Sequence, residues 1–178
     1  MRIIAGKFKK SNLFSVPGNT ARPTTDFTRE VVFSVLGDIS DQTVLDLYAG
    51  SGSLGLEALS RGASFTDFIE FSEKSIRTIL RNIEKLNCSE DCKIHRKKVS
   101  PYLKTCPKKF DLILMDPPYD KNLVNKTLEL CHEFELLHPK GNIVIEHSVF
   151  EKLEDKWTDY ISYHKKIGKS KLTVLTFK

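Results

Sequence analysis

The pattern of apolar and polar residues along this chain changes near residue 43. Between residues 2 and 16 a loose alternation predicts two short strands, arranged as a small hairpin or arm. Apolar residues then recur at four-residue spacing from Phe27 onward, which predicts a helix with an apolar face. Residues 24–26 are Thr-Thr-Asp, all suitable as its N-cap. This first part of the chain therefore predicts a hairpin followed by one helix.

From residue 43 onward, short apolar runs alternate with amphipathic segments. The runs predict strands at 43–47, 65–69, 93–95, 110–115 and 141–146, and the segments between them predict helices at 54–61, 72–86, 100–105 and 123–136. The helix at 72–86 has an apolar stripe formed by Ile76, Ile79, Leu80, Ile83 and Leu86. In the tail, 157–164 and 171–177 alternate and predict two antiparallel strands.

Near-continuous apolar strands separated by helices indicate a parallel sheet that is covered on both faces. We therefore expect an α/β fold, doubly wound and Rossmann-like, with an antiparallel pair of strands at its end. The change in the apolar pattern predicts an N-terminal extension at residues 1–40 and an α/β domain at residues 41–178.

Composition narrows the class of protein. The chain has 178 residues, of which 40% are hydrophobic and 29% charged, as in an ordinary globular protein with one core. It has no apolar run of about 18 residues, which excludes a transmembrane helix, and its start is too short in apolar residues for a signal peptide. We expect a cytoplasmic protein without a membrane partner.

Charge and cysteine content say little about the partner or about a metal site. The net charge of +5 is compatible with a nucleic-acid partner without requiring one. Basic residues gather near the N-terminus, at residues 93–98 and at residues 165–171. The four cysteines form no C-x-x-C pair and have no histidine partners at zinc-site spacing, so we expect free thiols and no metal.

The first candidate for chemistry is the stretch from Val44 to Gly55, which reads as a strand, a glycine-rich turn and the start of a helix. Gly50, Gly52 and Gly55 match the G-x-G-x-x-G pattern of dinucleotide sites. Glycine lets a ligand approach the backbone, and a helix N-terminus offers unpaired N–H groups. By itself this match is compatible with several ligands.

Two carboxylates are expected beside this turn. Asp46 lies near the end of the first strand and Glu70 at the end of the next. In open α/β sheets, ligands bind outside the carboxyl ends of the strands, where the strand order reverses. An acid at the second strand end suits a ribose diol, because a carboxylate accepts hydrogen bonds from both hydroxyls.

The second candidate is Asp116-Pro117-Pro118-Tyr119, which directly follows a predicted buried strand. Two prolines remove two N–H donors and stiffen the loop, which leaves acceptors only. Such a loop suits a planar ligand that carries an amino group, such as a nucleobase stacked on Tyr119.

The two candidates together resemble the S-adenosylmethionine-dependent amino methyltransferases that carry an (Asp/Asn)-Pro-Pro-(Tyr/Phe) motif. The segments 2–6, 22–26 with Arg29-Glu30, and 49–63 narrow this resemblance to the bacterial small-subunit ribosomal RNA guanine-N2 methyltransferase family. The likeness runs from residue 2 to about residue 147, and the tail is compatible with it.

The resemblance implies a seven-stranded methyltransferase sheet and S-adenosylmethionine as cofactor. It also implies a monomeric enzyme whose partner is ribosomal RNA within an assembled or assembling small subunit. It implies cofactor contacts from Asp46, Tyr48, Gly50, Ser51, Gly52 and Glu70. It assigns the target amine to Asp116, Pro117 and Tyr119, and an RNA-side or loop-ordering role to Arg2, Arg22, Thr24 and Arg29. One departure is Lys98-Val99, which stands where the family often has an acidic or amide residue followed by alanine, near the adenine.

Three other functions stay open at this point. An adenine-N6 methyltransferase acting on DNA or RNA usually carries Asn where this chain has Asp116. An NAD-dependent oxidoreductase would explain the glycines but not residues 116–119. A non-catalytic RNA-binding or assembly module would have no need of both motifs.

Overall fold

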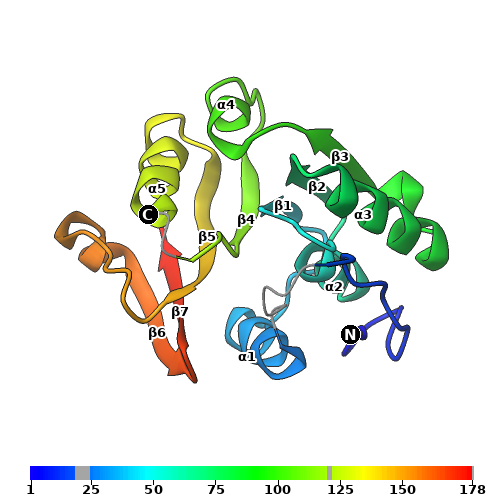
Figure 1. The fold of residues 1–178 in the computed structure, drawn as a ribbon. Helices are drawn as coiled ribbons and strands as arrows, with labels where there is room; N and C mark the ends of the chain where they lie inside the picture. The colour runs from blue at the N-terminus through cyan, green and yellow to red at the C-terminus, as the bar shows by residue number, and fades with distance from the viewer. Residues whose placement is uncertain (19–24, 120–121, 178) are drawn as a thin grey trace.

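The computed structural model describes residues 1–18, 25–119 and 122–177, and seven strands of this part form one sheet. Their order across the sheet is β3-β2-β1-β4-β5-β7-β6 (Figure 1). The strands are β1 (Thr43–Leu47), β2 (Phe65–Glu70), β3 (Cys92–Arg96), β4 (Phe110–Met115), β5 (Leu137–Ser148), β6 (Ile161–Ile167) and β7 (Ser170–Thr176). The first five pair in parallel, and β7 pairs antiparallel with both β5 and β6. The predicted mixed, doubly wound sheet is confirmed.

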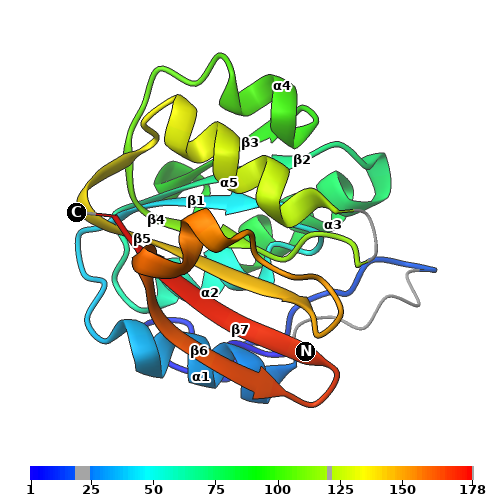
Figure 2. The ribbon, with the colours of Figure 1, turned by 90° about the vertical axis from the view of Figure 1, so that its left-hand side faces the viewer.

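Helices cover both faces of this sheet. They are α1 (Asp26–Leu36), α2 (Ser53–Ser60), α3 (Glu73–Leu86), α4 (Val99–Leu103) and α5 (Leu123–Glu133), with 3₁₀ turns η1 (Ser89–Asp91) and η2 (Asp155–Tyr160). Figure 2 shows α4 and α5 on one side of the sheet and α1 on the other. Residues of α1, α2 and α3 share one hydrophobic cluster, and residues of α4, α5 and η2 share a second.

Strand β1 shows why these runs form the centre of the sheet. Val44 belongs to the first cluster, whereas Leu45 and Leu47 belong to the second, and all three are fully buried. A strand that is buried on both faces reads as a continuous apolar run, and β1 and β4 have the bounds that the sequence predicts.

The N-terminal segment is a compact arm rather than two strands. A single antiparallel bridge joins Arg2 to Asn12, so the predicted pair of strands is wrong in that detail. Ile3 and Leu13 are buried in the same cluster as Phe33 of α1 and the residues of α2. The extension at residues 1–40 therefore shares its core with the body at residues 41–178.

Two predicted apolar faces are shifted. Helix α1 buries Val32 and Phe33, whereas Phe27 is exposed. In α3 the stripe is buried except for Leu80, whose side chain is more than half exposed. In both helices the misassigned residue lies at the edge of an apolar stripe, where spacing alone does not decide burial.

The tail differs from the prediction at its start. Residues 155–160 form the 3₁₀ turn η2, and the strand begins only at Ile161. Trp157 is buried in the second cluster, with its ring centroid 6.2 Å from that of Tyr160. Packing of these aromatic rings under α5 replaces the extended conformation that alternation predicted. Within the described residues, no helix is long and apolar enough to cross a membrane.

Candidate active site

The strand order reverses beside β1, which lies between β2 and β4. Leu47, the last residue of β1, is aligned with Ile69 of β2 on one side and with Met115 of β4 on the other. Glu70, the last residue of β2, and Asp116, the first residue after β4, therefore lie at the same edge of the sheet. This is the edge where ligands bind in open α/β sheets.

The glycine turn after β1 is built from residues with positive φ. Tyr48, Gly50 and Gly52 have φ of 60°, 57° and 79°, and Gly52 is the N-cap of α2. The third glycine has a packing role, because a Cβ at Gly55 would lie 2.4 Å from Cε1 of Phe68 in β2. The turn thus brings the start of α2 close to the sheet edge, with backbone rather than side chains facing the ligand side.

Tyr48 takes a left-handed conformation although it has a side chain. Its hydroxyl hydrogen-bonds Oγ1 of Thr127 in α5 at 2.8 Å, and burial raises the pKa of the phenol. The side chain therefore ties the glycine turn to the helix that follows residues 116–119 in the chain.

Asp46 is buried beneath this turn. Its Oδ2 accepts a hydrogen bond from the Gly55 N–H at 2.9 Å. Burial raises the pKa of Asp46 to about 8, and the neighbouring carboxylates of Asp116 and Glu70 raise it as well, against the lowering effect of the Gly55 hydrogen bond. Glu70 and Asp116 therefore lie close enough to Asp46 for their charges to disfavour its ionisation.

Glu70 caps backbone groups at the end of β2. Its Oε2 accepts from the Gly50 N–H at 2.9 Å, and its Oε1 accepts from the N–H groups of Phe71 and Ser72 at 2.7 and 2.8 Å. The carboxylate is held in place by the turn itself, which orients it toward the ligand side before any ligand arrives.

Tyr119 closes the other side of the site. Its hydroxyl donates to Oε1 of Glu146 at 3.4 Å, and the Ser170 hydroxyl donates to the same oxygen at 2.9 Å. Burial, Glu146 and Asp116 raise the pKa of Tyr119 to about 12, so the phenol is protonated at neutral pH. Glu146 and Ser170, on β5 and β7, were not predicted from the sequence, because nothing in their spacing links them to residues 116–119.

A cavity of about 840 Å³ joins these groups. Of the residues predicted to act on the cofactor or the target amine, those that line it are Asp46, Tyr48, Gly50, Ser51, Glu70, Asp116, Pro117 and Tyr119. Gly52 shapes the turn without lining the cavity. The volume falls within the range of small-molecule sites, about 300–1,000 Å³.

Two of the four predicted RNA-side residues, Arg2 and Arg29, do not line this cavity. Arg2 is exposed and pairs with Asp26, whereas Arg29 is fully buried and donates to the Arg2 carbonyl and to Asp26. The Arg29 side chain therefore joins the start of the N-terminal arm to α1. Arg22 and Thr24 lie outside the described residues.

Other lining residues had not been predicted. The rim of the cavity carries Lys97, Lys98 and Lys126, opposite in charge to the carboxylates inside. Met1, Ser15 and Val16 of the N-terminal arm also line it, and Lys98 lies over the ring of Phe71 at 5.3 Å. Lys98-Val99, the departure noted in the sequence, thus belongs to the cavity wall. In the described residues, no group of three or more His, Cys, Asp or Glu side chains is arranged to hold a metal ion.

Comparison with known proteins decides the family. Residues 1–176 match the family model described as "Conserved hypothetical protein 95". The chain belongs to this family. YlbH of Bacillus subtilis is 35% identical over 169 residues, covering 93% of this chain and 92% of the relative. Ribosomal RNA small subunit methyltransferase D of Buchnera aphidicola is 35% identical over 163 residues, covering 89% of this chain and 84% of the relative.

The fold comparison agrees. The solved structure of yhhF from Escherichia coli superimposes with a TM-score of 0.88 at 29% identity, covering 100% of this chain and 98% of that one. The family, the methyltransferase fold and S-adenosylmethionine as cofactor, all predicted from the sequence, are confirmed.

Proposed function

We propose that this protein transfers a methyl group from S-adenosylmethionine to the exocyclic 2-amino group of a guanine in small-subunit ribosomal RNA. The observation that carries the proposal is that residues 116–119 and the glycine turn line one cavity. Relatives named as small-subunit ribosomal RNA methyltransferases supply the substrate class. The acceptor-only loop suits an exocyclic amine, and the resemblance to the guanine-N2 methyltransferase family favours the 2-amino group of guanine.

The cavity suits a cationic methyl donor. Burial chiefly raises the pKa of Asp46, and the charges of Asp116 and Glu70 raise it further, so a positive charge beside these three side chains favours the ionised form of Asp46. The Gly50–Gly52 turn and the Glu70 carboxylate would hold the amino acid and ribose parts. When bound, S-adenosylmethionine supplies an electrophilic methyl group that needs no further activation by the protein.

The work left to the protein is to present the amine. A guanine 2-amino group is a poor nucleophile because its lone pair is delocalised into the ring. Asp116 and the Pro117 carbonyl accept its two N–H bonds, which favours a pyramidal nitrogen whose lone pair points toward the methyl group. Such alignment is worth about 7–11 kcal/mol in favourable cases. Acceptors beside the nitrogen also stabilise the positive charge that develops there.

The base must leave its stack to enter this cavity, and Tyr119 offers a ring on which it can lie. The Glu146–Ser170 pair holds the Tyr119 hydroxyl and so fixes the orientation of that ring. Lys97, Lys98 and Lys126 at the rim suit phosphates of the surrounding strand. We expect the substrate to be an assembled or assembling subunit in the cytoplasm, and the enzyme to act as a monomer.

The second candidate is transfer to adenine N6 in DNA or RNA, which the same fold and acceptor loop would serve. Asp116 in place of the asparagine that is usual for that chemistry favours guanine. Tritium-labelled methyl transfer to small subunits, ribosomal RNA and DNA in parallel distinguishes the two. Mass spectrometry of nucleosides from the labelled RNA would then identify the methylated base, and N2-methylguanosine is the result that we expect.

The acceptor role of Asp116 has its own test. We expect Asp116→Ala to abolish methyl transfer, by at least about a hundredfold in kcat, because one acceptor of the amine is lost. Binding of S-adenosylhomocysteine, measured by calorimetry, should stay within a few-fold of wild type. Turnover near the wild-type value would show that the amine is held by other groups.

The ribose role of Glu70 is tested separately. We expect Glu70→Ala to weaken cofactor binding by one order of magnitude or more, since it removes a charged acceptor and also releases the Gly50 N–H. Calorimetric titration with S-adenosylhomocysteine measures this. An unchanged dissociation constant would overturn the assignment.

A further inference from the structure

An exposed aromatic ring with two cations stands beside the cavity, on the N-terminal arm and α3. The guanidinium of Arg81 lies over the ring of Phe14, 4.0 Å from its centroid, and the ammonium of Lys85 lies 5.0 Å from the same centroid. Phe14, Arg81 and Lys85 are all exposed. We refer to these three residues as the Phe14 platform.

The two cations are not used within the protein. Neither Arg81 nor Lys85 forms an ion pair with a described residue, whereas Arg77, one turn earlier in α3, pairs with Glu73 at 3.1 Å. Two unpaired positive charges on one aromatic ring repel each other, so the cluster favours an anion between or beside them.

The ring is fixed rather than loosely attached. Asn82 of α3 is fully buried, accepts a hydrogen bond from the Phe14 N–H at 2.7 Å and donates to the Phe14 carbonyl at 3.1 Å. Its amide also donates to the Ser51 carbonyl in the glycine turn at 2.9 Å. One side chain therefore joins the Phe14 platform directly to the turn that lines the cavity.

The Phe14 platform is also continuous with the cavity wall. Ser15 and Val16, the next two residues of the arm, line the cavity, as does Ser51. A strand of nucleic acid that places one nucleotide in the cavity would therefore have a neighbouring nucleotide beside the arm.

We propose that the Phe14 platform is a docking surface for a nucleotide that flanks the target guanine in the RNA substrate. Arg81 and Lys85 bind its phosphates, and the Phe14 ring supports its sugar or base. A stacked ring and paired cations form the arrangement by which proteins hold single-stranded nucleic acid without reading its sequence. This inference rests on the proposed function and adds to it a second contact point outside the cavity.

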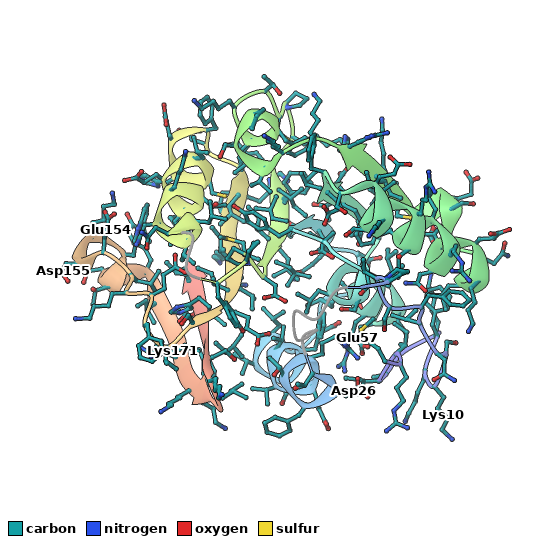
Figure 3. All side chains as sticks on the ribbon, viewed as in Figure 1. Lys10, Asp26, Glu57, Glu154, Asp155 and Lys171 are labelled. Atoms are coloured by element: carbon teal, nitrogen blue, oxygen red, sulfur yellow. The ribbon has the colours of Figure 1, made fainter. Side chains whose placement is uncertain are left out.

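The test uses the full-length protein and small ribosomal subunits purified from cells that lack it. We compare Arg81→Gln/Lys85→Gln with the charge-matched control Lys109→Gln/Lys156→Gln. The control lysines pair with Glu135 and with Glu129 and Glu154. Figure 3 labels Glu154 and Asp155, the neighbours of Lys156, on the side of the molecule away from the N-terminal arm and its Lys10.

We expect Arg81→Gln/Lys85→Gln to raise the KM for subunits roughly tenfold and to lower the slope of log affinity against log salt by about one to two, as the loss of two phosphate contacts requires. Its kcat at saturating subunits and its affinity for S-adenosylhomocysteine should match wild type. Phe14→Leu keeps an apolar side chain but removes the ring, and we expect a smaller rise in KM with an unchanged salt slope.

Equal KM values and salt slopes in the two double variants would overturn the proposal. In Arg81→Gln/Lys85→Gln, a loss of affinity without any change in salt slope would also overturn the proposal, because that would indicate a protein contact rather than phosphates. Binding of labelled subunits is measured apart from methyl transfer. Failure of the wild-type enzyme to methylate guanine would therefore count against the proposed function, whereas unchanged subunit affinity would count only against the Phe14 platform.

Discussion

At the scale of single residues, Asp46 links the fold of the site to its chemistry. A carboxyl whose folded pKa is raised from the usual range to about 8 binds a proton in the folded state that the unfolded chain has already released. Its burial therefore costs stability increasingly as pH rises from about 4 to about 8. A cationic ligand reverses this, because it favours the ionised carboxylate.

We expect the affinity for S-adenosylmethionine to increase as pH rises from 6 to 8, by at most about tenfold per pH unit, because binding expels one proton from Asp46. S-adenosylhomocysteine has the same amino acid part without the sulfonium charge and should show a smaller increase. Calorimetry in buffers of different ionisation enthalpy measures the proton release. In Asp46→Asn the difference between the two ligands should vanish, and its persistence would assign the proton to another group.

The sequence predicted some residues of the site and missed others. Asp46, Glu70 and Asp116 were predicted, because a polar residue at the end of a buried strand stands out from the apolar run before it. Glu146 and Ser170 were missed, since their link to Tyr119 depends on the antiparallel return of β7 beside β5. Such a contact between distant strands leaves no mark in local spacing.

At the scale of elements, strand bounds were predicted best where a strand is buried on both faces, as in β1 and β4. Strand β5 is longer than predicted, because its first residues around Pro139 are exposed and carry no apolar pattern. The turn η2 was misread as strand because Trp157 and Tyr160 alternate with polar residues but pack with Phe177 as an aromatic cluster. Pattern alone does not distinguish these cases.

One buried carboxylate of α2 accepts hydrogen bonds from the N-terminal arm. Glu57, labelled in Figure 3, is fully buried; its Oε2 accepts from the Ile4 N–H at 2.8 Å, and its Oε1 accepts from the Ala5 N–H at 3.1 Å and from Arg61 at 2.8 Å. We expect Glu57→Ala to lower the free energy of unfolding by about 3 kcal/mol or more, because three donors lose their acceptor. Urea denaturation measures this loss.

The exposed pair of Glu73 with Arg77 provides the control for that experiment. Glu73→Ala removes a carboxylate at the same i,i+4 spacing on a helix surface, and we expect a change within about 0.5 kcal/mol. Limited proteolysis should cleave the first residues of Glu57→Ala faster than those of Glu73→Ala. Equal stability of the two variants would mean that the arm is held chiefly by its other contacts, among them those of the apolar residues Ile3 and Leu13 and the hydrogen bonds to Ser60.

At the scale of the whole molecule, parts of the chain that are far apart in sequence meet at the cavity. The N-terminal arm, the β1–α2 turn and residues 116–119 after β4 all line it. A ligand there contacts parts that are distant in sequence but lie against the same sheet. Binding therefore stabilises the whole fold rather than one loop, and a thermal transition reports it.

This gives a direct discrimination between methyl donor and dinucleotide. At a concentration of about 100 times its dissociation constant, a ligand adds about 2.7 kcal/mol, which for a chain of this size raises the Tm by roughly 5–10 °C. We expect that shift with S-adenosylhomocysteine and none with NAD, because the NAD pyrophosphate would face the acidic side chains of Glu70 and Asp116. Asp116→Ala should keep the shift and Glu70→Ala should lose most of it. Protection by NAD equal to that by S-adenosylhomocysteine would contradict the assignment of the cavity to a methyl donor, because a site lined by acidic side chains disfavours a pyrophosphate.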